Sequence, residues 1–335
     1  MHNINELKSL LSEAKKIVIT THHKPDGDAM GSSLGLYHFL LSLGHQVHLV
    51  TPSDYPYFLH WLPGNSEVID FQMQADKSMQ LVAEADLIFC TDFNALSRIG
   101  ALGELVHQSA AKKVMIDHHL EPEGFEDFTF WDVRACAAAE LVYRLIVSLG
   151  YGHHIDKDIA TCLYTGIMTD SGSFRFPSTS AEVHRIIADL IDKGANNSRI
   201  HELIYDTNTE NRLKFLGHVL SQKMVILAEI NTAYIYIDQE ELKKYQIVTG
   251  DTEGIVNYAL SINGIRFAIL VVDRGEARKL SFRSKGEFPA NEVAKKYFEG
   301  GGHRNAAGGI SFLSLSETVA KIKAILPEFE EMLKQ

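Results

Sequence analysis

The sequence predicts an α/β protein in which a doubly wound, mostly parallel sheet is joined by a helical connector to a smaller α/β domain. In the first half of the chain, short apolar runs alternate with amphipathic segments, which is typical of βαβ units. After about residue 222 the apolar runs follow one another more closely, which indicates a second domain. The length of 335 residues also favours two domains. We therefore expect a first domain over residues 1–190, a helical linker over 191–221 and a second domain over 222–335.

The first domain contains the apolar runs that predict the parallel sheet and the amphipathic segments that predict its helices. The predicted strands cover residues 16–21, 46–51, 86–92 and 113–119. The predicted helices cover residues 29–44, 96–110, 137–150, 158–170 and 180–195. The polar segment that follows, 196–220, predicts the helical connector.

The second domain combines strands with fewer helices. The predicted strands cover residues 224–230, 232–239, 266–274 and 279–285. The predicted helices cover residues 289–299 and 315–333.

The composition is that of an ordinary globular protein, with 45% hydrophobic and 22% charged residues. No apolar run approaches the roughly 18 residues that span a bilayer. The amphipathic N-terminal segment 1–16 lacks the apolar core and the cleavage site of a signal peptide. Cys90, Cys136 and Cys162 have no paired spacing, which excludes a disulfide framework. We therefore expect buried free thiols in a cytoplasmic protein that does not bind membranes.

The net charge of −11 argues against binding to long duplex nucleic acid, because proteins that hold long nucleic acid normally carry a basic surface. A small phosphorylated ligand is compatible with this charge if metal ions and a few local cations hold it.

Acidic and histidine side chains follow the predicted elements at four places. The segment "HHKPDGD" (22–28) follows the first strand, Asp92 ends the third, "DHH" (117–119) ends the fourth, and Asp170 ends a helix. Ligands of an open parallel sheet collect at the carboxyl ends of its strands, so these groups should crowd into one crevice. A pair of divalent cations would offset their repulsion. The alternative, ordinary turn residues around Pro-Asp-Gly, has to explain four coincidences.

The predicted ligand set contains no sulfur. This disfavours a structural zinc site and suits manganese, with magnesium or cobalt as alternatives. His23 lies next to a predicted ligand, and we expect it behind the ligands or at the surface.

Five motifs resemble those of the DHH phosphoesterase superfamily, in the same order. The segments "THHKPDGDAMGS", "TDFNALSRIG", "DHH" and "GIMTDSGSF" resemble its four metal motifs. The segment "GGGHRNAAGG" (300–309) resembles the glycine-rich signature of the DHH-associated domain. Together they span nearly the whole chain, and the group they resemble most is that of the NrnA-type nanoRNases and pAp phosphatases.

The resemblance implies a centre with two metal ions and one bridging carboxylate. One manganese would be bound by His22, Asp26 and Asp92, and the second by Asp28, Asp92, His118 and Asp170. Asp117 would then orient a histidine, because metal-bound histidines usually donate their other ring nitrogen to a carboxylate. His119 would face the substrate phosphate or the leaving group.

The second domain contains a local cationic patch, for which a solvated strand face is an equally good explanation. Its basic residues are Arg266, Arg274, Arg278, Lys279, Arg283 and Lys285. The resemblance places a phosphate-binding arginine at Arg283. In the glycine-rich segment, the backbone N–H groups of Gly301 and Gly302 suit an anion, His303 can reach a phosphate, and Arg304 could assist. A plain glycine turn is the alternative.

One segment departs from the resemblance. Residues 136–145 read "CAAAELVYRL", where related proteins often have serines and threonines ahead of the helix. The missing hydroxyls remove helix caps and polar contacts near the site. We therefore expect this chain to differ from related proteins in how it positions the substrate, and not in how it binds metals.

The resemblance implies a manganese-dependent hydrolase that degrades very short RNA to 5′-mononucleotides and converts pAp to AMP. Its partners would be short single-stranded RNA, pAp or pApA, with no long duplex and no membrane, and a homodimer remains open. A soluble phosphodiesterase for pApA or cyclic dinucleotides would share the metal site. An inorganic pyrophosphatase would also share it, but the glycine-rich motif argues against that. A nucleotide-sensing binding protein would have lost a metal ligand, and the sequence retains them all.

Overall fold

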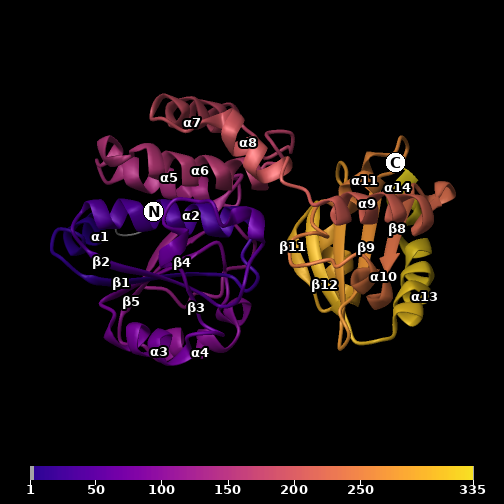
Figure 1. Cartoon of the computed structure of the whole chain (residues 1–335), viewed down its shortest axis with the longest axis horizontal. Coiled ribbons are helices and arrows are strands. Elements are labelled where there is room, and N and C mark those ends of the chain that lie inside the picture. Colours follow the sequence, from indigo (N-terminus) through magenta and orange to yellow (C-terminus); the bar gives the residue numbers. More distant parts are fainter. Residues whose placement is uncertain (1–3, 335) are drawn as a thin grey trace. The chain divides into compact units, whose positions relative to one another are not determined.

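The computed structural model of the chain describes residues 4–334. The chain divides into two compact units, Met1–Thr207 and Asn208–Gln335, and Figure 1 colours it along the sequence. Residues 1–3 of the predicted amphipathic N-terminal segment lie outside the described residues, and the segment continues as helix α1, Ile4–Leu10.

The first unit contains a six-stranded sheet in the order β3-β2-β1-β4-β5-β6. All neighbouring strands are parallel. Because β2 and β4 flank β1 on opposite sides, the sheet is doubly wound, which confirms the predicted fold class. The edge strands β3 and β6 are not among the predicted strands, since they contain only two and four residues. The strands are β1 (Lys16–Thr21), β2 (Gln46–Thr51), β3 (Ile69–Asp70), β4 (Leu87–Thr91), β5 (Lys112–Asp117) and β6 (Phe128–Trp131).

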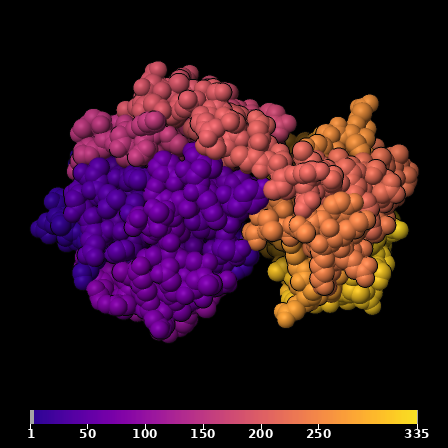
Figure 2. All heavy atoms as spheres, in the orientation of Figure 1, coloured from indigo at the N-terminus to yellow at the C-terminus, as the bar shows by residue number. Residues whose placement is uncertain are grey.

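Helices cover both faces of this sheet (Figure 1). Helices α2, α5 and α6 cover one face through a core that includes Leu34, Leu141 and Leu163. Helices α3 and α4 cover the other face with Val82 and Leu102. Helices α7 and α8 lie outside α5 and α6 and form part of the surface of this unit (Figure 2). The bounds are α2 (Gly27–Ser42), α3 (Ala75–Glu84), α4 (Ala101–Gln108), α5 (Ala138–Ser148), α6 (Lys157–Asp170), α7 (Ala181–Asp192) and α8 (Asn197–Tyr205).

One predicted helix is interrupted. The segment 96–110 forms a short 3-10 turn, Leu96–Ile99, followed by α4. Gly100 separates the two pieces with a φ of 58°, which lies in the left-handed region and cannot continue a right-handed helix.

Helices α2 and α6 pack with their backbones in close contact. Gly27, Gly31 and Gly35 are spaced by four residues, so they lie on one face of α2. A Cβ at Gly31 would lie 2.6 Å from the carbonyl oxygen of Cys162, closer than Cβ atoms approach other atoms in proteins. A Cβ at Gly27 would meet the side chain of Thr169. The glycines therefore bring the first turn of α2 against the last turn of α6, where acidic side chains of both helices lie.

The second unit contains a mixed sheet in the order β11-β12-β10-β9-β8-β7, in which β8 and β9 are parallel and the other pairs antiparallel. Helices α12, α13 and α14 cover one face with residues such as Val293 and Ile322. Helices α9, α10 and α11 cover the other with residues such as Val219 and Leu242. The strands are β7 (Met224–Leu227), β8 (Thr232–Ile237), β9 (Phe267–Asp273), β10 (Arg278–Ser284), β11 (Gly301–His303) and β12 (Ala306–Ser311). The helices are α9 (Glu210–Gln222), α10 (Gln239–Lys244), α11 (Ile255–Ser261), α12 (Ala290–Tyr297), α13 (Leu315–Ile325) and α14 (Glu330–Lys334).

The connector segment is divided between the units. The range 191–221 contains the end of α7 and all of α8, which belong to the first unit, and most of α9, which belongs to the second. Cys90, Cys136 and Cys162 are buried free thiols, as predicted. Within residues 4–334, no helix combines the length and the apolar character needed to cross a bilayer.

Candidate metal centre

The loop between β1 and α2 presents His22 to two carboxylates. Its Nδ1 donates a hydrogen bond to the carbonyl oxygen of His23 at 3.0 Å. This bond fixes the ring so that Nε2 lies 3.8 Å from Asp26 Oδ1 and 3.5 Å from Asp92 Oδ2. The neighbouring His23 is exposed. Of the two histidines, His22 is therefore the one placed to bind a metal.

Asp26 is the N-cap of α2. Its Oδ1 accepts hydrogen bonds from the backbone N–H groups of Asp28 at 3.0 Å and Ala29 at 3.1 Å. The cap explains why α2 begins at Gly27 rather than at the predicted residue 29. The first turn carries Asp28 inward, where its exposure falls to 1%. The Pro-Asp-Gly segment therefore begins α2. It places the Asp26 carboxylate before the helix and the Asp28 carboxylate in its first turn.

His118 follows β5, and three carboxylates surround one of its ring nitrogens. Its Nδ1 donates to the carbonyl oxygen of Ala135 at 3.1 Å. This orientation places Nε2 3.4 Å from Asp92 Oδ1, 3.6 Å from Asp170 Oδ2 and 3.7 Å from Asp28 Oδ2. A backbone carbonyl therefore holds this histidine, where a carboxylate was expected.

Asp92 joins the two groups. It follows β4 with a φ of 64°, and only 2% of it is exposed. Its Oδ2 faces His22 and its Oδ1 faces His118. The buried Oδ1 makes no hydrogen bond with the part of the chain that the structure describes. A buried carboxylate oxygen without a donor is costly, and a cation would relieve that cost.

These donors fit metal ions. Ligand atoms of His22, Asp26 and Asp92 lie within 4.8 Å of one another, as do those of Asp28, Asp92 and His118. Two atoms that each lie about 2.1 Å from one ion are about 3–4 Å apart, which matches the distances around both histidine Nε2 atoms. Both sets consist of imidazole nitrogens and carboxylate oxygens and contain no sulfur. The structure therefore brings all six predicted metal-binding side chains together, and the acidic and histidine clusters could hold metal ions.

The pKa values of these side chains also show that the site favours bound positive charge. Burial alone would lower the pKa of His22, but Asp26 and Asp92 raise it to about 10. Asp92 and the other nearby carboxylates also outweigh burial at His118 and raise its pKa well above the ordinary value. Burial, with Asp92 and Asp170, raises the pKa of Asp28. Without a metal ion these three side chains favour bound protons, so metal binding competes with protonation.

Asp28 has a second role, at the start of α5. Its carboxylate accepts hydrogen bonds from the backbone N–H groups of Ala138 and Ala139, the latter at 2.9 Å. The N-cap residue of α5, Ala137, has no side-chain acceptor to offer. Glu140 accepts from the N–H of Cys136 at 2.7 Å. The hydroxyls missing from "CAAAELVYRL" are thus replaced by two carboxylates, that of Asp28 from α2 and that of Glu140 within the segment itself.

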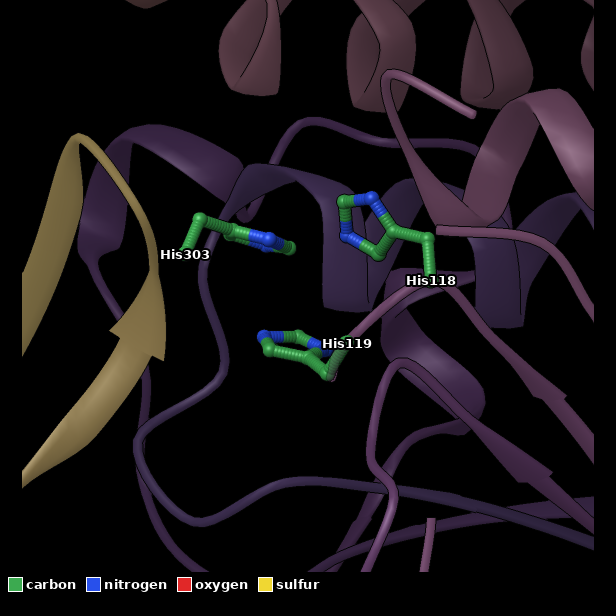
Figure 3. Close-up of side chains that lie close together, drawn as sticks. All are labelled: His118, His119 and His303. Atoms are coloured by element: carbon green, nitrogen blue, oxygen red, sulfur yellow. The ribbon is translucent and has the colours of Figure 1, made fainter. Parts of the chain in front are cut away.

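Asp117 holds His119. One Asp117 oxygen accepts from His119 Nδ1 at 2.8 Å and the other from the His119 backbone N–H at 3.0 Å. The rings of His118 and His119 are 5.0 Å apart between centroids and cross at 73° (Figure 3). Burial and the Arg98 guanidinium lower the pKa of His119, although Asp117 opposes them. His119 is therefore oriented by Asp117 and stays neutral at neutral pH.

Sequence reasoning missed Arg98, which lies in the quoted segment "TDFNALSRIG". Its carbonyl oxygen accepts from the His23 N–H at 2.8 Å, which ties two of the site loops together. Its half-buried side chain makes no hydrogen bond or ion pair within residues 4–334. A basic residue within a motif of the acidic site was the signal that could have singled it out.

The substrate-binding candidates of the second unit lie on β10 and in the β11–β12 hairpin. Arg283 and His303 both pair with Ala306, one on each side of β12, so they share a face of the sheet. Gly301 and Gly302 belong to β11, which pairs with β12 instead of forming a loop. Arg304 is in the turn, where its guanidinium pairs with Glu287 at 2.6 Å.

Only part of the cationic patch is available to bind a phosphate, because other groups of the chain already hold Arg278. Arg278 contacts Asp273 at 3.2 Å and donates to the carbonyl oxygens of Leu313 and Gly275. It alternates with Lys279 and Arg283 along β10 and therefore lies on the opposite face.

The DHH family N-terminal domain matches residues 16–167, and the DHHA1 domain matches residues 229–335. A protein of Thermus thermophilus named bifunctional oligoribonuclease and PAP phosphatase NrnA is 32% identical over 292 residues, which covers 87% of this chain and 83% of that protein. The chain belongs to the DHH family.

Two further relatives cover nearly all of this DHH family protein. The Bacillus subtilis protein of the same name is 28% identical over 331 residues, 98% of each chain. The crystal structure of an exopolyphosphatase-related protein from Bacteroides fragilis matches with a TM-score of 0.94 and 41% identity, covering 99% of this chain and 97% of that one. Both matches therefore extend over the two units of this DHH family protein.

Proposed function

We propose that this DHH family protein is a manganese-dependent enzyme that hydrolyses very short RNA to 5′-mononucleotides and removes the 3′-phosphate of pAp. The chain is a phosphoester hydrolase of the DHH family. Its finer substrate class is inferred from the NrnA relatives, whose names include both activities. The observation that carries the proposal is the pair of donor sets that share Asp92.

Two metal ions would occupy these sets. His22, Asp26 and Asp92 would bind one ion, and Asp28, Asp92, His118 and Asp170 the other. When bound, a metal pair of this kind lowers the pKa of a bridging water and clamps the phosphoryl oxygens for in-line displacement. Oxygen and imidazole ligands suit manganese, with magnesium or cobalt as alternatives.

The remaining site residues would act on the substrate. His119, held by Asp117, would contact the phosphate or the leaving oxygen through Nε2. Arg283 and His303 would neutralise phosphate charge. They could act on the same phosphate, because both lie on one face of the second sheet. No residue of the chain needs to form a covalent intermediate.

The partners would be short single-stranded RNA and small phosphorylated nucleotides in the cytoplasm. The net charge of −11 and the small number of available cations disfavour a long nucleic-acid track. A phosphodiesterase for pApA would use the same metal centre, so pApA belongs in the first assay.

The test is a parallel assay of purified protein with manganese on an RNA dinucleotide, pAp and pApA. We expect hydrolysis of the dinucleotide and of pAp, and loss of both activities after chelation. The Asp92→Asn variant is the control for a contaminating nuclease, because it should be inactive in the same preparation. Activity on pApA alone, or activity of the unmodified protein no greater than that of Asp92→Asn, would overturn the proposal.

A further inference from the structure

Trp131 is the last residue of β6 and lies beside the proposed site. The register of the parallel β5–β6 pair places Trp131 opposite Asp117. Paired residues of neighbouring strands point to the same face of a sheet, so the indole lies alongside the Asp117 carboxylate that holds His119. Trp131 therefore lies at the carboxyl end of the sheet, where ligands of doubly wound folds bind.

The indole is held in a fixed orientation and yet remains partly open to solvent. Its Nε1–H donates to the carbonyl oxygen of His119 at 2.7 Å. The residue is nevertheless 39% exposed, and Leu120, which follows His119, and Val133, two residues after Trp131, are each 41% exposed. The polar atom of the indole is satisfied, so the exposed part of the residue is apolar ring. A large aromatic side chain left open beside a polar site suits a planar ligand group.

We propose that the Trp131 indole stacks on the nucleobase of the nucleotide whose phosphate is hydrolysed. This inference rests on the proposed function and names the part of the substrate that the first unit recognises. Stacking on an aromatic side chain tolerates every base, because each base has a π-face. It would distinguish nucleotides from other phosphoesters, which the metal centre alone cannot do. It would also compensate for the small number of cations available to bind RNA.

A purely structural role for Trp131 makes a different prediction. If the indole only supports the His119 backbone through its N–H, then phenylalanine should fail as completely as alanine. If the ring stacks on the base, phenylalanine should retain most of the binding. The two substitutions therefore separate the hydrogen bond from the aromatic face.

Fluorescence gives a readout that needs no catalysis. The chain has two tryptophans, and Trp61 is partly buried in the core of the first unit. In a Trp61→Phe protein, all of the tryptophan emission comes from Trp131. We expect AMP, with manganese present, to quench this emission, and ribose 5-phosphate to leave it unchanged. Equal responses to the two compounds would overturn the inference. So would AMP binding, measured by calorimetry, that leaves the emission unchanged, or no binding of AMP at millimolar concentration.

Kinetics with pAp complete the test. Trp131→Ala should raise KM about 5- to 150-fold, and Trp131→Phe should change it by less than about fivefold. Val147→Ala is the matched control, because Val147 is an exposed apolar residue on α5, 46% exposed and outside the site. Equal losses in Trp131→Phe and Trp131→Ala would overturn the stacking role. Failure of the proposed function is recognised separately, as absence of hydrolysis in the unmodified chain, while the AMP titration still reports on Trp131.

Discussion

The Asp28 carboxylate accepts a hydrogen bond from the backbone N–H of Ala139 at 2.9 Å, which joins the first turn of α2 to the first turn of α5. The same side chain lies 3.7 Å from His118 Nε2, in the candidate metal centre. The Asp28 carboxylate thus both caps α5 and belongs to the candidate metal centre. Such a double role should be visible in the stability of the metal-free protein.

Asp28→Ala should destabilise the chelated protein by about 2 kcal/mol, because two buried N–H groups of α5 lose their acceptor. Urea denaturation with chelator present measures this loss. Asp28→Asn is the matched variant, since its amide oxygen can still accept one hydrogen bond. It should lose less stability than alanine, and equal losses would contradict the capping role.

Asp92→Asn should fold normally but bind little or no manganese, because one carboxylate faces both donor sets. Asparagine is preferable to alanine here, since the φ of 64° at this position is tolerated by Asp and Asn better than by most residues. Metal analysis after dialysis gives the content, and circular dichroism checks the fold. Retention of two equivalents of manganese would show that Asp92 is not the bridging ligand.

Gly31→Ala should destabilise the first unit by about 1–3 kcal/mol, because its Cβ would collide with the backbone of α6. The nearest atom, the carbonyl oxygen of Cys162, would lie 2.6 Å away. Thermal unfolding measures the change. Gly217→Ala is the control, since this helical glycine of α9 has open space around its Cβ position and should gain about 0.5–1 kcal/mol. A neutral Gly31→Ala variant would mean that α2 and α6 can separate at little cost.

Glu241 should stabilise the second unit in a pH-dependent way. It contacts His218 at 2.6 Å and Lys223 at 2.8 Å. Burial opposes ionisation, but these partners hold the pKa of Glu241 below its ordinary value of 4.5. A lowered pKa in the folded state means that the stabilisation is present above about pH 4.5 and is lost as the pH falls through the folded pKa.

Glu241→Gln should therefore lower stability by about 1–2 kcal/mol at neutral pH and by progressively less below pH 4.5. Glutamine still allows the side-chain contact with the Asp238 N–H that closes the capping box of α10. Denaturation of both proteins across pH 3–7 makes the comparison. Glu210→Gln is the control, because it affects only a surface pair with Lys214. Its stability should match that of the unmodified protein at every pH.

RNAs of two to five nucleotides should be cleaved faster than a 24-mer, because the chain offers few cations to neutralise phosphates. Arg283→Ala should raise KM, and lower kcat as well if its contact strengthens in the transition state. Steady-state kinetics over a length series, at two salt concentrations, measures both effects. A rate that increases with length up to the 24-mer, together with a steep salt dependence, would indicate an extended binding track.

The alternation of apolar runs and amphipathic segments was sufficient to predict the parallel sheet and most of its helices. It also placed His22 and Asp92 near the ends of their strands, together with Asp117, which is the last residue of β5. These features depend on local periodicity and on the rule that parallel strands end at one edge of a sheet. The edge strands β3 and β6 were missed because they are too short to show a period.

The sequence by itself determined which side chains could form a metal centre, because its carboxylates and imidazoles stand in motifs that resemble the metal motifs of a known family, in the same order. Only the tertiary structure decided how each is held. The Ala135 carbonyl fixes His118, Asp117 holds His119 rather than His118, and Asp28 caps α5. The first and the last of these contacts involve backbone groups of residues distant in sequence, and a backbone carbonyl or N–H carries no sequence signature. The close approach of α2 and α6, on which the position of Asp28 depends, likewise exists only once two helices meet.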